Sequence, residues 1–176
     1  MSKYTALLVV DVQEELFLPH KNLYKGDELL SNIKLLIEKA HQTQTSVIYI
    51  QHTQNDDGPM VKGKPGWQLH HQLTPMKDEK VILKYNPDSF QDTILQQVLS
   101  SMNINKLIIT GLMTEYCIDT TCRRAYSLGY KTTLVKDGHS TYDNGILTPE
   151  QIIRHHNQTL GGWFLKVVPT NEINFE

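Results

Sequence analysis

Apolar strand-like segments alternate with amphipathic helical segments along almost the whole chain, and this alternation constrains the fold most. The segment "TALLVVD" (5–11) is an unbroken apolar run ending in an acid, which is typical of a strand buried on both faces of a parallel sheet. Residues 28–42 then show apolar positions at helical spacing. Joined by right-handed crossovers, such units predict one α/β domain over residues 1–176, a three-layer fold with a six-stranded, mostly parallel sheet and helices on both faces.

The other elements follow from the same two patterns. Strands are predicted at 46–51, 80–85, 106–110, 131–137 and 163–168, and helices at 88–102, 114–130 and 148–160. The last helix opens with Thr148, Pro149 and Gln151, which form a capping box with proline at the first helical position. Residues 52–79 are polar, rich in glycine and proline, and show little periodicity, so we expect a functional loop or lid there.

Composition excludes some classes of partner. The 176 residues include 17 Lys and Arg and 19 Asp and Glu, a formal net charge of −2, so neither nucleic acid nor a membrane surface is expected as the partner. The longest apolar run is too short to cross a bilayer. The first residues lack the apolar region of a signal peptide. We therefore expect a cytoplasmic protein that acts on a small molecule.

Three chemically capable residues come at or just beyond the ends of predicted strands: Asp11, Lys84 and Cys117. Ligands bind open parallel sheets at the carboxyl ends of the strands, so the fold should gather an acid, a base and a thiol at one edge. Taken singly, each has a plainer interpretation: Asp11 as a turn residue, Lys84 as a solvated strand end and Cys117 as a small core residue. Their conjunction favours catalysis.

The chemistry gives each of the three a role. A thiolate is the nucleophilic form of cysteine, and we expect the start of a helix and the ammonium of Lys84 to lower the pKa of Cys117. Asp11 would take the thiol proton and return it to a leaving amine. The backbone amides of Met113 and Cys117 are the candidates for an oxyanion hole. The second cysteine, Cys122, is expected to pack in the helix, and its direction argues against a disulfide.

Three segments resemble the isochorismatase-like cysteine hydrolase superfamily, which includes nicotinamidases and N-carbamoylsarcosine amidohydrolases. They are "LLVVDVQEELF" (7–17), "VILKYNPDSFQDTIL" (81–95) and "TGLMTEYCIDTTCRRAYSLGYKTTLVKDGHSTYD" (110–143). The resemblance covers nearly the whole chain and implies an isochorismatase-like, Rossmann-like fold. It implies an Asp11–Lys84–Cys117 triad and a cis peptide bond between Leu112 and Met113.

The resemblance also bears on substrate binding and assembly. Gln13 and Phe17 match the superfamily's Asp-x-Gln-x-x-x-Phe pattern, which implies that they line the pocket. Trp67 is expected either to close over the pocket on a lid or to anchor the loop to the body of the protein. Tyr116 either faces the pocket or contacts a partner subunit. The resemblance further implies a homodimer or homotetramer.

The chain departs from the nicotinamidase pattern at the metal site. Nicotinamidases carry an Asp-x-His metal motif after the second strand, where this chain has Gln51-His52-Thr53. The adjacent His70 and His71 do not restore that spacing. We therefore expect no metal and no other cofactor, and interpret the three histidines as hydrogen-bonding residues of the lid.

The leading hypothesis is an amidase-type hydrolase that cleaves a C–N bond of a small molecule through a thioester on Cys117. True isochorismatases act without this cysteine, so a vinyl-ether substrate is disfavoured, and residues 51–70 resemble a branch that contains streptothricin hydrolase-like enzymes. One alternative is a thiol redox or small-molecule binding protein without hydrolysis, although the chain has no Cys-x-x-Cys pair. Another is a chain that keeps the triad without a physiological substrate.

Overall fold

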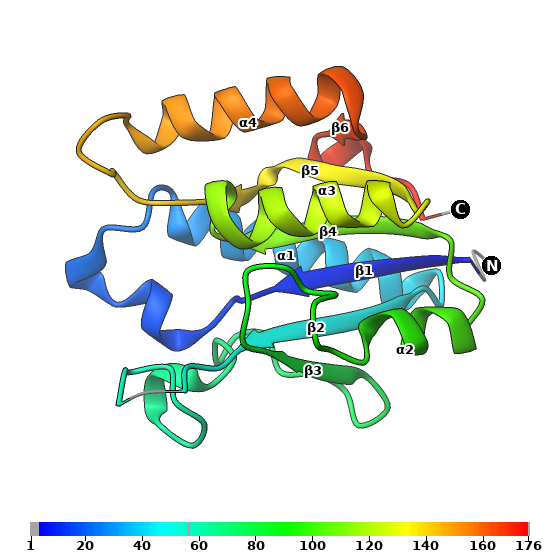
Figure 1. The fold of residues 1–176 in the computed structure, drawn as a ribbon, viewed down its shortest axis with the longest axis horizontal. Helices are drawn as coiled ribbons and strands as arrows, with labels where there is room; N and C mark the ends of the chain where they lie inside the picture. The colour runs from blue at the N-terminus through cyan, green and yellow to red at the C-terminus, as the bar shows by residue number, and fades with distance from the viewer. Residues whose placement is uncertain (1–3, 56, 176) are drawn as a thin grey trace.

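A six-stranded parallel sheet forms the centre of the molecule (Figure 1), in the strand order β3-β2-β1-β4-β5-β6. The computed structural model describes residues 4–55 and 57–175. Outside the described residues lie 1–3, 56 and 176 of the predicted domain, and residue 56 is also part of the predicted lid. The strands are β1 Thr5–Val10, β2 Ser46–His52, β3 Lys80–Lys84, β4 Lys106–Leu112, β5 Lys131–Ser140 and β6 Lys166–Val168. The predicted three-layer α/β fold is confirmed.

Helices cover both faces of the sheet (Figure 1). They are α1 Gly26–Gln42 on one face and α2 Leu95–Ser101, α3 Asp119–Ser127 and α4 Pro149–Trp163 on the other. Alternate residues of β1 enter the two cores: Leu8 packs with α2 and α3, whereas Leu7 packs with α1. Because β1 is buried on both sides, every residue in it must be apolar or hydrogen-bonded, which explains its unbroken apolar run.

Several predicted boundaries differ from the structure, and local contacts explain two of them. The helix expected at 88–102 begins only at Leu95. Before it, Asp88 accepts a hydrogen bond from the amide of Phe90 at 2.8 Å, and the hydroxyls of Ser89 and Thr121 lie 2.8 Å apart, so these side chains stabilise a turn rather than a helix start. The strand expected from residue 163 starts at Lys166 because α4 runs on to Trp163. The capping box of α4 is confirmed.

Short helical turns follow the strands at the carboxyl edge. They are η1 Glu14–Phe17, η2 Pro19–Lys21, η3 Pro65–Trp67, the π-helical turn η4 Thr114–Ile118 and, near the C-terminus, η5 Thr170–Glu172. The helix predicted at 114–130 is therefore divided into η4 and α3. Across the described part of the chain, none of the helices has the length and apolar character needed to span a bilayer.

Gly111 lets the end of β4 lie directly against β1. Its φ is +127°, and a Cβ built there would lie 2.0 Å from the carbonyl oxygen of Val10. Gly111→Ala should therefore lower the free energy of unfolding by about 3 kcal/mol or more, since both a strained φ and a backbone clash are introduced. Chemical denaturation would measure the change.

Gly129→Ala is the matched control for this substitution. Gly129 also has a positive φ, +86°, but a Cβ there meets nothing within 4 Å. Only the backbone strain is then introduced, so a loss of about 1 kcal/mol is expected. Equal losses in the two variants would show that the contact with Val10 is unimportant.

Candidate active site

Asp11, Lys84 and Cys117 meet at the carboxyl edge of the sheet. The ammonium nitrogen of Lys84 lies 2.7 Å from Oδ2 of Asp11 and 3.0 Å from the sulfur of Cys117. The strand order explains this position. The sheet is built outward in opposite directions from the neighbouring strands β1 and β4, so the strand order reverses between them. A crevice at the carboxyl ends of two such strands is the usual binding site of an open α/β sheet. The predicted gathering of the three side chains is confirmed.

The Lys84 ammonium is fully enclosed and fully paired. Its side chain is 0% exposed, and that of Asp11 is 3% exposed. Besides the ion pair with Asp11 and the contact with Cys117, Nζ donates to the carbonyl oxygen of Asn86 at 3.0 Å, so three polar atoms surround the ammonium. Asp11 itself has a left-handed φ of 52°, and its amide donates to Ile50 at 2.9 Å, which fixes the carboxylate where β1 ends.

The pKa values of Lys84 and Cys117 correct the expectation that the thiol pKa is lowered. Burial opposes a charge on Lys84, but the negative charge of Asp11 and the hydrogen bonds to Asp11 and Cys117 outweigh burial and raise the pKa of the lysine. For Cys117, burial and then the charge of Asp11 raise the pKa to about 12, and Lys84 only partly offsets them. The expected lowering of the thiol pKa is therefore wrong: at neutral pH Cys117 is a protonated thiol beside a carboxylate.

A protonated resting thiol predicts the pH dependence of alkylation. Well below the pKa, the thiolate fraction rises about tenfold per pH unit, so iodoacetamide should modify Cys117 about 100-fold faster at pH 9 than at pH 7. Mass spectrometry of the intact protein would follow the adduct. Cys117→Ala should give none, because Cys122 is fully buried. A rate that stops rising near pH 8 would contradict the raised pKa.

The turn that carries Cys117 is held rigidly. The Leu112–Met113 peptide bond is cis, the isomer that the resemblance implies. The carbonyl oxygen of Met113 accepts hydrogen bonds from the amides of Tyr116 and Ile118, both at 3.2 Å. These contacts fix the orientation of η4 relative to the end of β4.

His139 supports this turn, and the sequence analysis did not identify it. Its Nδ1 lies 2.8 Å from the hydroxyl of Thr114, and its Nε2 lies 3.0 Å from Oδ1 of Asn157 in α4. Burial lowers its pKa to about 4, so the ring is neutral at neutral pH. His139 follows the predicted strand 131–137 in a polar stretch, and no spacing rule marks it.

Gln13 and Trp67 hold the long loop against the sheet. Nε2 of Gln13 donates to the carbonyl oxygens of His52 at 2.9 Å and Trp67 at 2.7 Å, and its Oε1 accepts from the amide of His52. The indole of Trp67 donates to Thr53, and its carbonyl oxygen also accepts from Gln51. Of the two expectations for Trp67, these bonds favour the anchor. Contact of either residue with substrate stays a prediction.

Phe17 is half-buried, whereas Tyr116 is exposed. Phe17 packs its ring edge against His70, with 4.7 Å between ring centroids, and contacts the core beneath α1. Tyr116 is 53% exposed, which suits either a pocket rim or a subunit contact. Their contact with substrate also stays a prediction.

The predicted hydrogen-bonding histidines behave differently from one another. His71 bonds Glu14, and Nδ1 of His70 accepts from the amide of Gln72 at 3.3 Å. Nδ1 of His52, by contrast, is buried and has no hydrogen-bond partner among the described residues, so the expectation is wrong for that atom. Burial lowers the pKa of His52, which keeps the ring neutral beside Lys84.

Two surface hollows do not coincide with the triad. One of about 850 Å³ lies among α1, β5 and α4, and one of about 330 Å³ lies beside the loop that contains Trp67 and His70. Neither is lined by Asp11, Lys84 or Cys117. We assign the candidate active site from the arrangement of these three side chains, because they place a nucleophile beside a carboxylate and an ammonium, which neither hollow does.

Comparison with known proteins identifies the family. The family model described as Isochorismatase domain matches residues 5–148. The chain belongs to the isochorismatase family. An isochorismatase family protein of known crystal structure superposes with a TM-score of 0.89 at 33% identity, covering 96% of this chain and 99% of that one. An isochorismatase from Pseudomonas putida KT2440 gives 0.90 at 28% identity, covering 98% and 91%.

Sequence relatives of this isochorismatase-family chain include named hydrolases. Two streptothricin hydrolases from Streptomyces noursei are 31% and 33% identical over 138 and 141 residues, each covering 78% of this chain. The chain spans 55% and 50% of their lengths. An uncharacterized isochorismatase family protein, YrdC, from Bacillus subtilis is 32% identical over 146 residues, covering 81% of this chain and 76% of that protein.

Proposed function

We propose that this protein is a cysteine hydrolase that cleaves an amide-type C–N bond of a small molecule through a thioester on Cys117. The observation that carries the proposal is the position of one buried ammonium between a carboxylate and a thiol, 2.7 Å from Asp11 and 3.0 Å from Cys117. A nucleophile beside a base, oriented by a third charged group, is the general arrangement of covalent catalysis.

The raised pKa of Cys117 defines the first step. As the sulfur forms a bond to the substrate carbonyl carbon, Asp11 accepts the thiol proton, so that no free thiolate is needed beforehand. The carbonyl electron pair moves to oxygen, and the amides of Met113 and Cys117 would donate to the resulting oxyanion. Before the attack Lys84 stabilises the negative charge of the Asp11 carboxylate, and it would stabilise charge that develops on sulfur as the proton leaves; after the attack the negative charge lies on the oxyanion.

The thioester forms and breaks with the same groups. When the oxyanion collapses, the C–N bond breaks and Asp11 gives its proton to the leaving nitrogen, which departs as an amine or ammonia. Water then attacks the thioester carbon while Asp11 accepts a proton from it. The acid product leaves, the proton returns to sulfur, and Cys117 is again a thiol.

The relatives support a carbonyl carbon bonded to nitrogen as the reacting group. Besides the streptothricin hydrolases, a ureidoacrylate amidohydrolase from Cronobacter sakazakii is 24% identical over 195 residues, covering 90% of this chain. An amidohydrolase cleaves a C–N bond with water. The substrate panel should therefore contain linear amides, lactams and ureido compounds.

Trapping of the intermediate tests the proposal directly. The protein is mixed with each panel compound, quenched in acid and weighed intact by mass spectrometry. We expect an adduct with the mass of the acyl group that maps to Cys117 and is removed by hydroxylamine. Reversible oxidation of Cys117 with no acylation by any compound would contradict the proposal and favour the redox alternative.

A further inference from the structure

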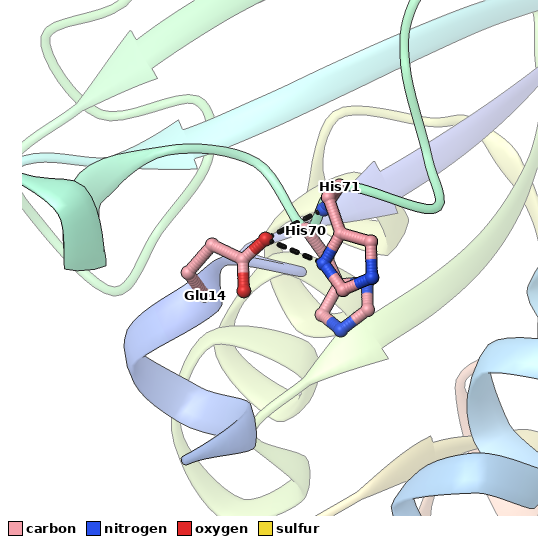
Figure 2. Close-up of side chains that lie close together, drawn as sticks. All are labelled: Glu14, His70 and His71. Atoms are coloured by element: carbon pink, nitrogen blue, oxygen red, sulfur yellow. Dashed lines mark hydrogen bonds and ion pairs between the residues drawn. The ribbon is translucent and has the colours of Figure 1, made fainter.

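Glu14, His70 and His71 form a cluster of potential metal ligands (Figure 2). Within the described residues, they are a group of three whose ligand atoms all lie within 4.8 Å of one another. Glu14 lies in η1, directly after β1, whereas the two histidines follow η3 in the long loop. Folding therefore joins residues 57 positions apart in the chain.

Backbone hydrogen bonds join the segment that carries Glu14 to the segment that carries His70 and His71. The amide of His70 donates to the carbonyl oxygen of Val12 at 2.9 Å, and the amide of Glu14 donates to Gln68 at 2.9 Å. Gln13 and Leu69 form an antiparallel bridge between them. The three potential ligands thus project from a fixed frame rather than from independent loops.

One pair of ligand atoms is already near the separation that a metal requires. Oε1 of Glu14 lies 2.9 Å from Nδ1 of His71 and also accepts from the His71 amide at 2.7 Å (Figure 2). Two ligands of a tetrahedral metal, each about 2.0–2.1 Å from it, lie roughly 3.3 Å apart. A small opening of this contact would therefore admit an ion between oxygen and nitrogen.

His70 is the third potential ligand, and the exposed ring of His71 would have to turn for all three groups to bind one ion. The two imidazoles are stacked, with centroids 4.4 Å apart and planes 28° apart, whereas a metal binds in the plane of each ring. The side chain of His71 is 70% exposed and can turn off the stack, while His70 is 5% exposed and stays fixed. Both rings line the hollow of about 330 Å³, so solvent ions reach them.

We propose that Glu14, His70 and His71 bind one divalent transition metal ion of the zinc class. Two imidazoles and one carboxylate form a ligand set that zinc accepts, and they leave the fourth position to water. These ligands differ from the Asp-x-His pattern, whose positions are occupied here by Gln51 and Thr53. The ion would fasten the long loop to η1, three residues from Asp11, and the proposal does not depend on the hydrolase function.

Calorimetric titration of the full chain with Zn²⁺ tests this site. We expect one ion per chain, with affinity about 100-fold lower in His71→Ala and in Glu14→Gln, since each removes a ligand. His155→Ala is the matched control: this exposed histidine lies in α4 beside His156, and its loss should leave the affinity unchanged. Circular dichroism would show that each variant stays folded.

A second measurement separates the proposed site from the catalytic thiol, which can also bind zinc. Titration of Cys117→Ala should give the same stoichiometry and affinity as the unmodified protein. Co²⁺ bound at the proposed site should show the visible d–d bands of a four-coordinate ion and no sulfur-to-metal charge-transfer band. Absence of binding, binding unaffected by His71→Ala, or binding lost in Cys117→Ala would each overturn the proposal.

Discussion

Cys117→Ala is expected to abolish turnover of any substrate that acylates the protein, with a loss in kcat of at least about 10⁴-fold. The reason is chemical: Asp11 and Lys84 would remain, but among the described residues no second thiol or hydroxyl is hydrogen-bonded to the Lys84 ammonium. The variant should stay folded, because Cys117 is partly exposed and its removal creates only a small void. Steady-state kinetics and the acyl-adduct assay would measure the two effects.

Cys122→Ala is the matched control for the nucleophile. Cys122 is fully buried in α3, five residues further on, and burial raises the pKa of its thiol. Its substitution should cost some stability through the lost core contact but leave the acyl adduct on Cys117 intact. If Cys117→Ala retained turnover, or if Cys122→Ala removed the adduct, the chemistry would not proceed through a thioester at Cys117.

The sequence was sufficient to predict the fold because its main signal is physical and local. An apolar run such as 5–10 is typical of a strand buried on both faces, and six strand-like segments separated by helical periodicity leave few topologies. The failures lie where side chains compete with the backbone. Asp88 and Ser89 match helix caps in isolation, but in the fold their hydrogen bonds stabilise a turn that brings Phe90 into the core.

The candidate catalytic positions were predictable from topology, but their electrostatics were not. Strand ends identify Asp11, Lys84 and Cys117, since the sheet brings those ends together. The pKa of Cys117 depends instead on how deeply the sulfur lies and how near the carboxylate is, and neither follows from spacing. The Glu14–His71 contact was missed for a related reason: it joins a turn to a loop of low periodicity, and no repeat in the sequence relates them.

Lys84→Met is expected to destabilise the protein by about 3–5 kcal/mol, in addition to reducing turnover. Methionine replaces the length of the side chain but leaves the carboxylate of Asp11, only 3% exposed, as a buried charge without its cation. Alkylation of Cys117 near neutral pH should also slow, because Lys84 is the group that favours the thiolate. Urea denaturation and iodoacetamide kinetics would measure these effects.

The double variant Asp11→Asn/Lys84→Met separates an uncompensated charge from lost packing. If the buried charge of Asp11 causes the destabilisation, removing that charge as well should restore most of the stability lost in Lys84→Met, although turnover stays absent. Lys25→Met is the surface control: Lys25 pairs with Glu28 at 3.0 Å in an exposed position, so its loss should change stability little. A double variant no more stable than Lys84→Met would mean that Lys84 acts through shape rather than through its charge, and the electrostatic account of the site would fail.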